Sequence, residues 1–441
     1  MEVAMQIPQG VETMMRTLVD HGFEAYLVGG CVRDALSGIA PHDYDITTDA
    51  LPDEIIGIFG EEHCKYYGKA FGTVCVHFGE DEAEITTYRT EGDYTDSRHP
   101  GRVDFTKDVM DDLSRRDFTT NAICYSPITG LLDPFGGAED LQKGILRAVG
   151  VPSDRFREDA LRIMRGMRFY ARFGLKPEPE TDAAMRAAAP DLANISVERI
   201  FTELCGMLRG EHITQVLMDY PDILSVPIPE VAPCVGFEQH TRHHDFTVWE
   251  HIARTVGNIA PETELRLTML LHDIAKPDCF SMDTDGGHFK GHAQLGAKYA
   301  DAILRRLRCD NRMRERICLL IEWHRKTPDR LPLARRLYGL MGGALYGEFL
   351  QVLASDRLSK KRGEPESGRR LEKAAALYRQ IEDEKLCCTV RELAVGGQDA
   401  MAAGLQGAQI RTKLEELLEL VITGRAENTR EALLPLLRGK L

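Results

Sequence analysis

The chain has 441 residues, enough for about three domains of ordinary size. Its formal net charge is −14, from 55 basic and 69 acidic residues, so a uniformly charged surface would repel nucleic acid. Any site for RNA or DNA must therefore be a local basic patch. The 11 cysteines show no metal-binding spacing, and no apolar run approaches the length of a membrane span. We therefore expect a soluble, cytoplasmic protein with no membrane partner.

Residues 1 to about 150 alternate short β-rich segments with helical ones, which predicts a mixed α/β unit. The expected strands are 24–30, 44–48, 72–79, 82–90 and 122–130. From about residue 153 the strand signals vanish, while helical periodicity and charge pairs continue almost to the end. The fold class expected is therefore α+β, with a mixed sheet in the N-terminal part and an all-helical remainder.

The segment GGCVRDALSGIAPHDYDITT (29–48) places two glycines after an apolar run and two aspartates shortly after them. Gly29 and Gly30 end an expected strand and precede an expected helix, so the backbone N–H groups there are suited to phosphate. Strand alternation would put Asp43 and Asp45 on one face. Such a pair favours a cation between its members, and hard oxygen ligands suit Mg²⁺ held together with substrate phosphates. The pattern predicts phosphoryl transfer from a nucleotide.

A third carboxylate would complete this metal site, and the expected strand at 82–90 offers two. We favour Glu84 as a catalytic residue, but Glu82 shares its face and stays an alternative. The order of glycine pair, helix and Asp-x-Asp resembles the nucleotidyltransferase superfamily. More narrowly, GGCVRD followed by DYDITT resembles the second-class family of tRNA nucleotidyltransferases and bacterial poly(A) polymerases. This resemblance implies a polymerase-β-like head and adds Arg33 to the nucleotide-binding residues.

A second motif, LSRRDFTTNAI (113–123), carries two arginines, an aspartate and an asparagine before an apolar segment. Arginine forks suit phosphate, whereas Asp and Asn side chains can hold a ribose hydroxyl. RRDFTTNA resembles the family's motif for ribose and triphosphate. The resemblance implies that Asp117 and Asn121 lie near the sugar, and that Arg115 or Arg116 lies near phosphate.

Six arginines fall within 18 residues of an expected helix, 155–172. At helical spacing Asp159 and Arg162 are i, i+3 neighbours and could present a joined acceptor and donor. Cytosine and adenine both show an amino donor beside a ring-nitrogen acceptor, so this pair would accept them and reject uracil and guanine. The competing interpretation is an ion pair on a solvated helix face. EDALRIMRGMRF resembles the family's templating motif, which implies nucleotide binding by Asp159, Arg162, Arg165 and Arg168.

Four residues of the C-terminal half combine imidazole and carboxylate groups: His251, His272, Asp273 and Asp356. Such groups together bind a divalent transition metal that can activate water. Their order resembles the HD phosphohydrolase domain, which implies a metal site here. His292 and His324 could complete a second metal site.

The resemblance spans nearly the whole chain. It implies a nucleotidyltransferase head at 1–150, a neck at 151–225, an HD domain at 226–375 and a helical tail at 376–441. SVERI (196–200) resembles a further element of the neck, whose surplus arginines are suited to tRNA phosphates.

The activity implied by the resemblance is the addition of C, C and A to the 3′ end of tRNA from CTP and ATP, without a nucleic-acid template and with release of pyrophosphate. A poly(A) polymerase, or an enzyme that adds only A or only CC, is the alternative. The segment 89–101 resembles the flexible loop of full CCA adders, which favours the first interpretation. A second alternative is an HD phosphohydrolase whose N-terminal half senses nucleotide. No protein partner is implied.

Overall fold

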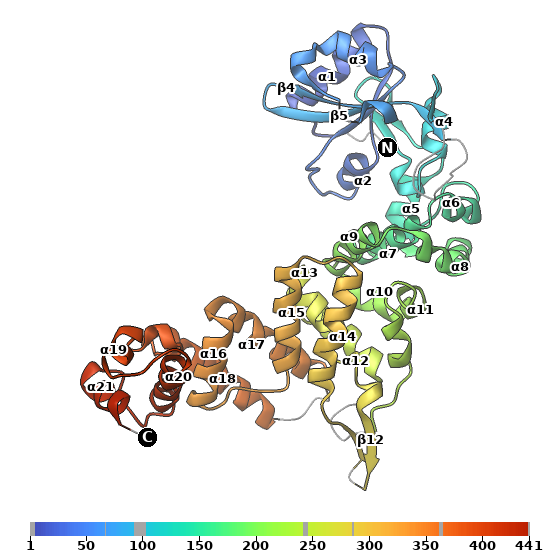
Figure 1. Cartoon of the computed structure of the whole chain (residues 1–441). Helices are drawn as coiled ribbons and strands as arrows, with labels where there is room; N and C mark the ends of the chain where they lie inside the picture. The colour runs from blue at the N-terminus through green and yellow to red at the C-terminus, as the bar shows by residue number, and fades with distance from the viewer. Residues whose placement is uncertain are drawn as a thin grey trace. The chain divides into compact units, whose positions relative to one another are not determined.

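The computed structural model describes residues 5–66, 68–91, 103–240, 246–284, 286–360 and 365–439. Most of the loop predicted at 89–101 lies outside these residues. The chain forms two compact units, Met1–Pro229 and Glu230–Leu441, coloured from blue into green and from yellow-green to red in Figure 1. The finer division into head, neck, HD domain and tail stays a prediction.

A mixed sheet of seven strands forms the base of the first unit. The order across it is β3 (Cys64–Lys65), β4 (Thr73–Phe78), β5 (Asp81–Thr87), β2 (Asp45–Thr48), β1 (Ala25–Val28), β8 (Cys124–Ser126) and β9 (Gly130–Leu132). Strands β2 and β5 run parallel, whereas the other neighbours are antiparallel. Each segment expected to be a strand coincides with one of these, so the prediction of a mixed α/β unit is confirmed.

One face of the sheet is apolar and covered. Ile46 and Ile85 on this face are fully buried. Two helices cover it, as Figure 1 shows: α1 (Gln9–Asp20) and α3 (Pro52–Phe59). Successive strand side chains alternate between faces, so Asp45 and Glu84 point to the opposite side. That opposite face carries polar groups and lines a cavity.

Helices complete the first unit: α2 (Gly30–Leu36), α4 (Val109–Ser114), α5 (Gly137–Lys143), α6 (Pro152–Glu158), α7 (Leu161–Phe173), α8 (Pro179–Ala188), α9 (Val197–Leu208), α10 (Ile213–Asp219) and α11 (Pro221–Leu224). The single helix expected over 155–172 is wrong, because α6 ends and α7 begins on either side of Asp159. This residue has extended backbone angles, φ −144° and ψ 103°. Its side chain accepts a hydrogen bond from the N–H of Leu161. Asp side chains make such bonds at the start of a helix, and the bond disfavours a continuous helix through this residue.

Short strand pairs lie outside the main sheet: β6 (Arg89–Glu91) with β7 (Val103–Phe105), β10 (Ile145–Leu146) with β11 (Lys176–Pro177), and β12 (Phe280–Asp283) with β13 (Gly286–Phe289). The expectation of an all-helical chain beyond residue 153 is therefore wrong at β11 and at the β12–β13 hairpin. Phe280 and Phe289 lie opposite each other in that hairpin, with ring centroids 5.5 Å apart, and such aromatic pairs favour strand pairing.

The second unit is otherwise built from helices: α12 (Val248–Gly257), α13 (Thr263–Leu271), α14 (His292–Arg306), α15 (Asn311–Trp323), α16 (Leu331–Met341), α17 (Gly343–Leu358), α18 (Pro365–Asp383), α19 (Gly397–Ala402), α20 (Ala408–Ile422) and α21 (Arg430–Arg438). The last three helices share a separate apolar core, to which Leu417 and Leu433 contribute fully buried side chains. The α+β fold class predicted from the sequence is confirmed.

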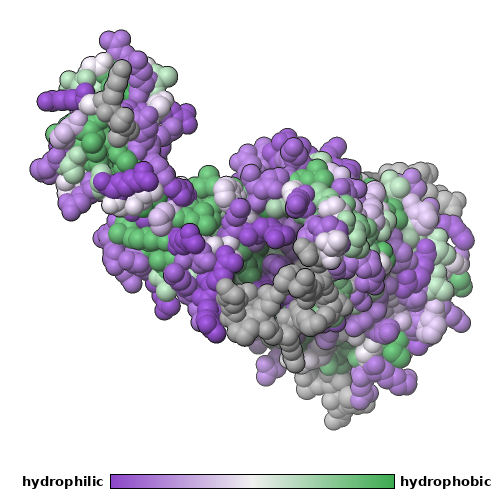
Figure 2. Space-filling view, turned by 90° about the horizontal axis from the view of Figure 1, so that it is seen from below, coloured by the Kyte–Doolittle hydropathy of each residue, from purple (hydrophilic) through white to green (hydrophobic). Residues whose placement is uncertain are grey.

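No helix within the described ranges is long and apolar enough to cross a membrane. Hydrophilic residues predominate on the face of the molecule drawn in Figure 2, and apolar residues appear there as separate patches. The apolar side chains are instead gathered in the buried cores.

Candidate active site and metal centre

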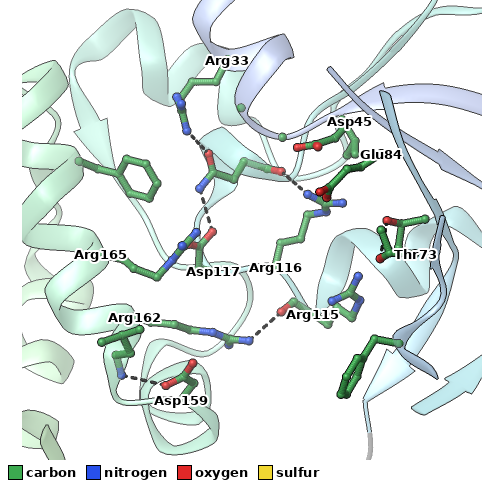
Figure 3. A pocket seen from close by; sticks show the side chains of 18 of the residues that line it. Arg33, Asp45, Thr73, Glu84, Arg115, Arg116, Asp117, Asp159, Arg162 and Arg165 are labelled. Atoms are coloured by element: carbon green, nitrogen blue, oxygen red, sulfur yellow. Dashed lines mark hydrogen bonds and ion pairs between the residues drawn. The ribbon is translucent and has the colours of Figure 1, made fainter. Parts of the chain in front are cut away.

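A cavity of about 720 Å³ opens on the polar face of the main sheet, and Figure 3 shows part of its lining. Strands β1, β2 and β5 contribute to it, as do helices α7 and α9. Its lining contains eight arginines and four carboxylates. The carboxylates are Asp45, Glu84, Asp117 and Asp159. On a chain of net charge −14, this is the local basic patch that binding of a polyanion requires.

Asp45 and Glu84 lie at the same level of two parallel strands, and both face the cavity (Figure 3). Burial raises the pKa of Asp45, and the charge of Glu84 raises it further. Arg116 opposes this shift, and Asp43 adds to it. Repulsion between such carboxylates is relieved by a divalent cation, and oxygen donors of this kind suit Mg²⁺. The pair therefore fits a metal ion of that class.

The other two candidate carboxylates lie differently. Asp43 is exposed, because the chain bends after Pro41 and β2 begins only at Asp45. The predicted alternation of both aspartates along one strand is therefore wrong, and Asp43 is not part of the cavity lining. Within the described residues, Asp43, Asp45 and Glu84 do not bring their oxygens within 4.8 Å of one another. Glu82 and Glu84 are both exposed, but Glu82 is bonded to side chains of β4, whereas Glu84 lies level with Asp45 on the neighbouring strand.

The glycine pair joins β1 to α2. Gly29 has φ 73° and ψ −122°, a conformation that L side chains rarely adopt. A Cβ atom there would lie 3.0 Å from Nη1 of Arg116, so glycine permits this guanidinium to approach the backbone. Gly30 begins α2, a helix of seven residues. Arg33 on that helix is buried and donates to Oδ1 of Asn121 at 2.6 Å.

The two adjacent arginines of the second motif share one buried partner. Fully buried Asp112 accepts from Nη2 of Arg115 at 2.6 Å and from Nη2 of Arg116 at 3.1 Å. Burial acts to raise the pKa of Asp112, but the two guanidinium groups outweigh it, so the pKa is lowered. The charged carboxylate holds both arginines, which line the cavity.

Asp117, which is labelled in Figure 3, and Asn121 form a second part of this network. The carboxylate of Asp117 accepts from Nδ2 of Asn121 at 2.9 Å and from Nε of Arg165 at 2.8 Å. Burial acts to raise the pKa of Asp117, but Arg165 and the Asn121 hydrogen bond lower it to about 2. The structure thus brings the predicted phosphate and ribose residues together at one wall of the cavity.

Asp159 and Arg162 both line the cavity, but their side chains hold different partners. Asp159 accepts from Nη2 of Arg199 at 2.7 Å. Arg162 is 8% exposed and donates to Oε2 of Glu158 at 2.7 Å. The predicted joined pair on one helix is wrong, because the helix breaks at Asp159. The alternative of a solvated ion pair is wrong as well, because Arg162 is buried.

The sequence analysis did not identify two residues of α9 that hold Asp159 and Arg168 in place. Arg199 binds Asp159, and one turn later Glu203 accepts from Nε of Arg168 at 2.6 Å. The motif SVERI contains Arg199, so a local signal existed. Its connection to the cavity depends on α9 packing along α7, which the sequence pattern does not report.

The predicted HD residues converge in the second unit. His251 lies on α12, His272 and Asp273 follow α13, and Asp356 lies on α17. Nε2 of His251 is 3.1 Å from Oδ1 of Asp356 and 3.3 Å from Oδ2 of Asp273. Nε2 of His272 is 3.2 Å from the same Oδ2 atom. The four ligand atoms lie within 4.8 Å of one another, and all four residues are less than 9% exposed.

His292 and His324 approach the other oxygen of Asp273, with Nε2 at 3.3 and 3.6 Å from Oδ1. In each of the four histidines Nδ1 contacts a backbone carbonyl oxygen, at 2.5 to 3.2 Å. This contact keeps the proton on Nδ1 and turns the Nε2 lone pair toward the carboxylates. Nε2 of His272 and His292 and Oδ1 of Asp273 are buried with no hydrogen-bond partner among the described residues. A divalent cation between these lone pairs would remove their mutual repulsion, so this set of nitrogen and oxygen ligands fits a metal ion.

Two lysines that the sequence analysis did not assign contact the same carboxylates. Nζ of Lys276 is 2.7 Å from Oδ2 of Asp273, and Nζ of Lys360 is 2.5 Å from Oδ2 of Asp356. Burial lowers the pKa of Lys276, although Asp273 acts to raise it. Each carboxylate of the centre therefore has one oxygen facing a lysine.

A second cavity, of about 470 Å³, borders the HD centre at the start of α14. Lys290, Arg325 and Lys326 line it together with His292. A cationic lining beside a buried imidazole suits an anionic group.

A mixed sheet that carries paired carboxylates beside an arginine-lined cavity defines the class of nucleotidyltransferases. Three family models match the chain, with a poly A polymerase head domain at 25–147, a probable RNA and SrmB-binding site of polymerase A at 174–233, and an HD domain at 246–373. The chain therefore combines a poly A polymerase head domain and an RNA-binding region of polymerase A with an HD domain.

Solved structures and sequence relatives agree with this placement. The Bacillus stearothermophilus CCA-adding enzyme in complex with CTP is 28% identical, with a TM-score of 0.73 over 98% of this chain and 97% of that one. The Thermotoga maritima enzyme complexed with tRNA shares the fold, with a TM-score of 0.61 at 18% identity, over 97% and 94% of the two chains.

The CCA-adding enzyme of Streptococcus pneumoniae is 49% identical over 195 residues, which are 44% of this chain and 48% of that protein. The CCA-adding enzyme of Staphylococcus aureus is 44% identical over 200 residues, 45% and 50% of the two proteins. The matched part thus spans about half the length of these curated relatives.

Proposed function

We propose that the protein adds C, C and A to the 3′ end of tRNA from CTP and ATP, releasing pyrophosphate. The observation that carries this proposal is that Asp45, Glu84 and the two arginines Arg115 and Arg116 all line one cavity. The likeness over nearly the whole chain to a CTP-bound CCA-adding enzyme supports the choice of nucleotide. The eleven free cysteines support action in the reducing cytoplasm.

Asp45 and Glu84 would hold Mg²⁺, with the exposed Asp43 as a third candidate ligand. When bound, this ion supplies Lewis-acid activation of the tRNA 3′-hydroxyl and stabilises the charge on the phosphates. Arg115 and Arg116, held by a buried carboxylate, are oriented to bind the triphosphate without reorganising.

The sugar and base would be bound by the neighbouring wall of the cavity. Asp117 and Asn121 offer oxygen and amide groups to the ribose. Asp159 would accept from the amino groups of cytosine and adenine, and Arg162 would donate to their ring nitrogens. Each side chain is already held by its own partner, Arg199 and Glu158, so their positions are set before a base enters.

The test uses tRNA transcripts that lack CCA, with each labelled NTP in turn. Asp45→Ala and Glu84→Gln should abolish both C and A addition, since one metal site serves every step. Glu82→Gln is the matched control on the same strand and should retain activity. Asp43→Ala measures whether the exposed aspartate takes part.

C addition by Asp45→Ala within about tenfold of the wild-type rate would contradict the metal assignment, because that equals only about 1.4 kcal/mol of barrier. Repeated addition of A alone by the wild-type protein would instead favour a poly(A) polymerase. Addition of only A or only CC would indicate a partial enzyme.

We propose as a second activity that the HD centre is a metal-dependent phosphohydrolase. The observation in its favour is the set of four histidines whose Nε2 atoms surround Asp273 and Asp356, beside a cavity with a cationic lining. A divalent transition metal held there would supply an activated water.

The experiment for this centre is hydrolysis of phosphomonoesters and 2′,3′-cyclic nucleotides with added divalent metals. The wild-type protein should show activity that chelation removes. A protein that hydrolyses these compounds but adds no nucleotide to tRNA would favour the interpretation of a phosphohydrolase with a nucleotide-sensing N-terminal half.

A further inference from the structure

A second group of metal-ligating side chains lies on the polar face of the main sheet, outside the lining of the nucleotide cavity. Cys75 and His77 are two residues apart on β4, so both point to that face. Glu82 on β5 is the direct cross-strand partner of His77. The β4–β5 hairpin therefore brings a thiol, an imidazole and a carboxylate together.

The three side chains are already in contact. Sγ of Cys75 donates to Oε1 of Glu82 at 2.8 Å, and Nδ1 of His77 lies 3.1 Å from Oε2 of the same residue. One ligand atom from each residue lies within 4.8 Å of the other two. Among the described residues, this is the only such group that contains a cysteine.

We propose that Cys75, His77 and Glu82 form a binding site for a divalent ion of the zinc class. Sulfur, nitrogen and oxygen donors in one group are the combination that Zn²⁺ prefers, whereas Mg²⁺ takes oxygen ligands. The site is thus chemically distinct from the carboxylate pair of the nucleotide cavity. Three protein ligands leave one position of a tetrahedral ion for water.

The surroundings allow an ion to enter. Cys75 and His77 are half-buried and Glu82 is exposed. Nζ of Lys65 lies 4.0 Å from Oε2 of Glu82, where its exposed and flexible side chain can move away. The charges of a thiolate and a carboxylate would balance those of a divalent ion.

The bound ion would tie together two strands next to the predicted catalytic carboxylate, since Cys75 lies directly opposite Glu84 in the β4–β5 ladder. Binding releases the thiol proton, because the ligand is the thiolate. The affinity for the metal should therefore rise with pH. These expectations hold whether or not the protein adds nucleotides to tRNA.

The test is titration of the full-length protein with Co²⁺, which reports a sulfur ligand by thiolate-to-cobalt charge-transfer absorption in the near ultraviolet. The wild-type protein should develop this absorption as cobalt is added beyond the amount that the HD centre takes up, and Zn²⁺ should remove it. The HD centre offers no thiolate, so its cobalt would not contribute. Cys75→Ser should abolish the absorption, and Cys279→Ser, at another half-buried thiol, is the matched control that should retain it.

His77→Ala should weaken cobalt binding by about tenfold or more, equivalent to about 1.4 kcal/mol. A second measurement, independent of the variants, is the alkylation of Cys75 in the wild-type protein followed by mass spectrometry, which Zn²⁺ should slow. Absence of charge-transfer absorption in the wild-type protein would overturn the proposal, leaving a thiol–carboxylate hydrogen bond only. Its persistence in Cys75→Ser would overturn it as well.

Discussion

Replacing Arg199 with alanine should reduce the discrimination between CTP and UTP more than it reduces folding stability. Arg199 donates to Oδ2 of Asp159 at 2.7 Å, and the other oxygen accepts from the N–H of Leu161. Loss of the guanidinium leaves the proposed base-reading carboxylate with one anchor, so it can rotate away from the amino group of cytosine.

The expected loss of discrimination follows from the strength of the hydrogen bond between Arg199 and Asp159. A hydrogen bond to a charged group contributes about 1.5–3 kcal/mol when shielded. The side chains of Arg199 and Asp159 are 25% and 15% exposed, so the lower end of that range applies. About 1.4 kcal/mol corresponds to a tenfold change, and we therefore expect kcat/KM for CTP relative to UTP to fall by about tenfold.

The assay is competition among all four NTPs on a tRNA that ends at the discriminator base. Arg199→Lys keeps the charge and should lose less selectivity. Arg186→Ala breaks an exposed ion pair with Asp222 outside the cavity and serves as the control for general loss of stability. An unchanged ratio of CTP to UTP in Arg199→Ala, with normal folding by circular dichroism, would refute the positioning of Asp159. An unchanged ratio in Asp159→Asn would refute its role in base selection.

Three further outcomes are expected. Changing both His272 and Asp273 to alanine should remove metal-dependent phosphohydrolysis and leave CCA addition largely intact, and loss of addition in a folded variant would contradict two separate sites. Gly29→Ala should destabilise the protein by about 1–3 kcal/mol in urea unfolding and slow nucleotide addition, because its φ is positive and a Cβ would press on Arg116; full activity would show that the backbone adjusts freely. The lowered pKa of Asp117 stabilises the fold above about pH 4, and this contribution is lost as the pH falls toward 2. It amounts to about 2 kcal/mol, and Asp117→Asn should flatten the stability–pH curve in that range.

Short-range patterns in the sequence were enough to predict the local structure of several parts of the site. The glycine turn before α2 and the cluster of Asp117 and Asn121 each depend on residues close together in the chain. Alternation along a strand predicted that Glu82 and Glu84 share one face, and the structure has both on the polar face, because side-chain direction in a strand has a period of two. The same rule did not apply to Asp43, since the chain bends there before the strand begins.

Other features depended on the tertiary structure. The choice of Glu84 over Glu82 rests on the register between β2 and β5, which sets Asp45 level with Glu84. Both glutamates have the same parity along the strand, so the sequence alone could not separate them. The partner of Asp159 was likewise decided by packing, because Arg199 lies 40 residues away and reaches it only where α9 packs along α7. Local periodicity predicts the face of a strand or helix on which a side chain lies. Strand register and helix packing are instead determined by contacts between segments that are distant in the chain.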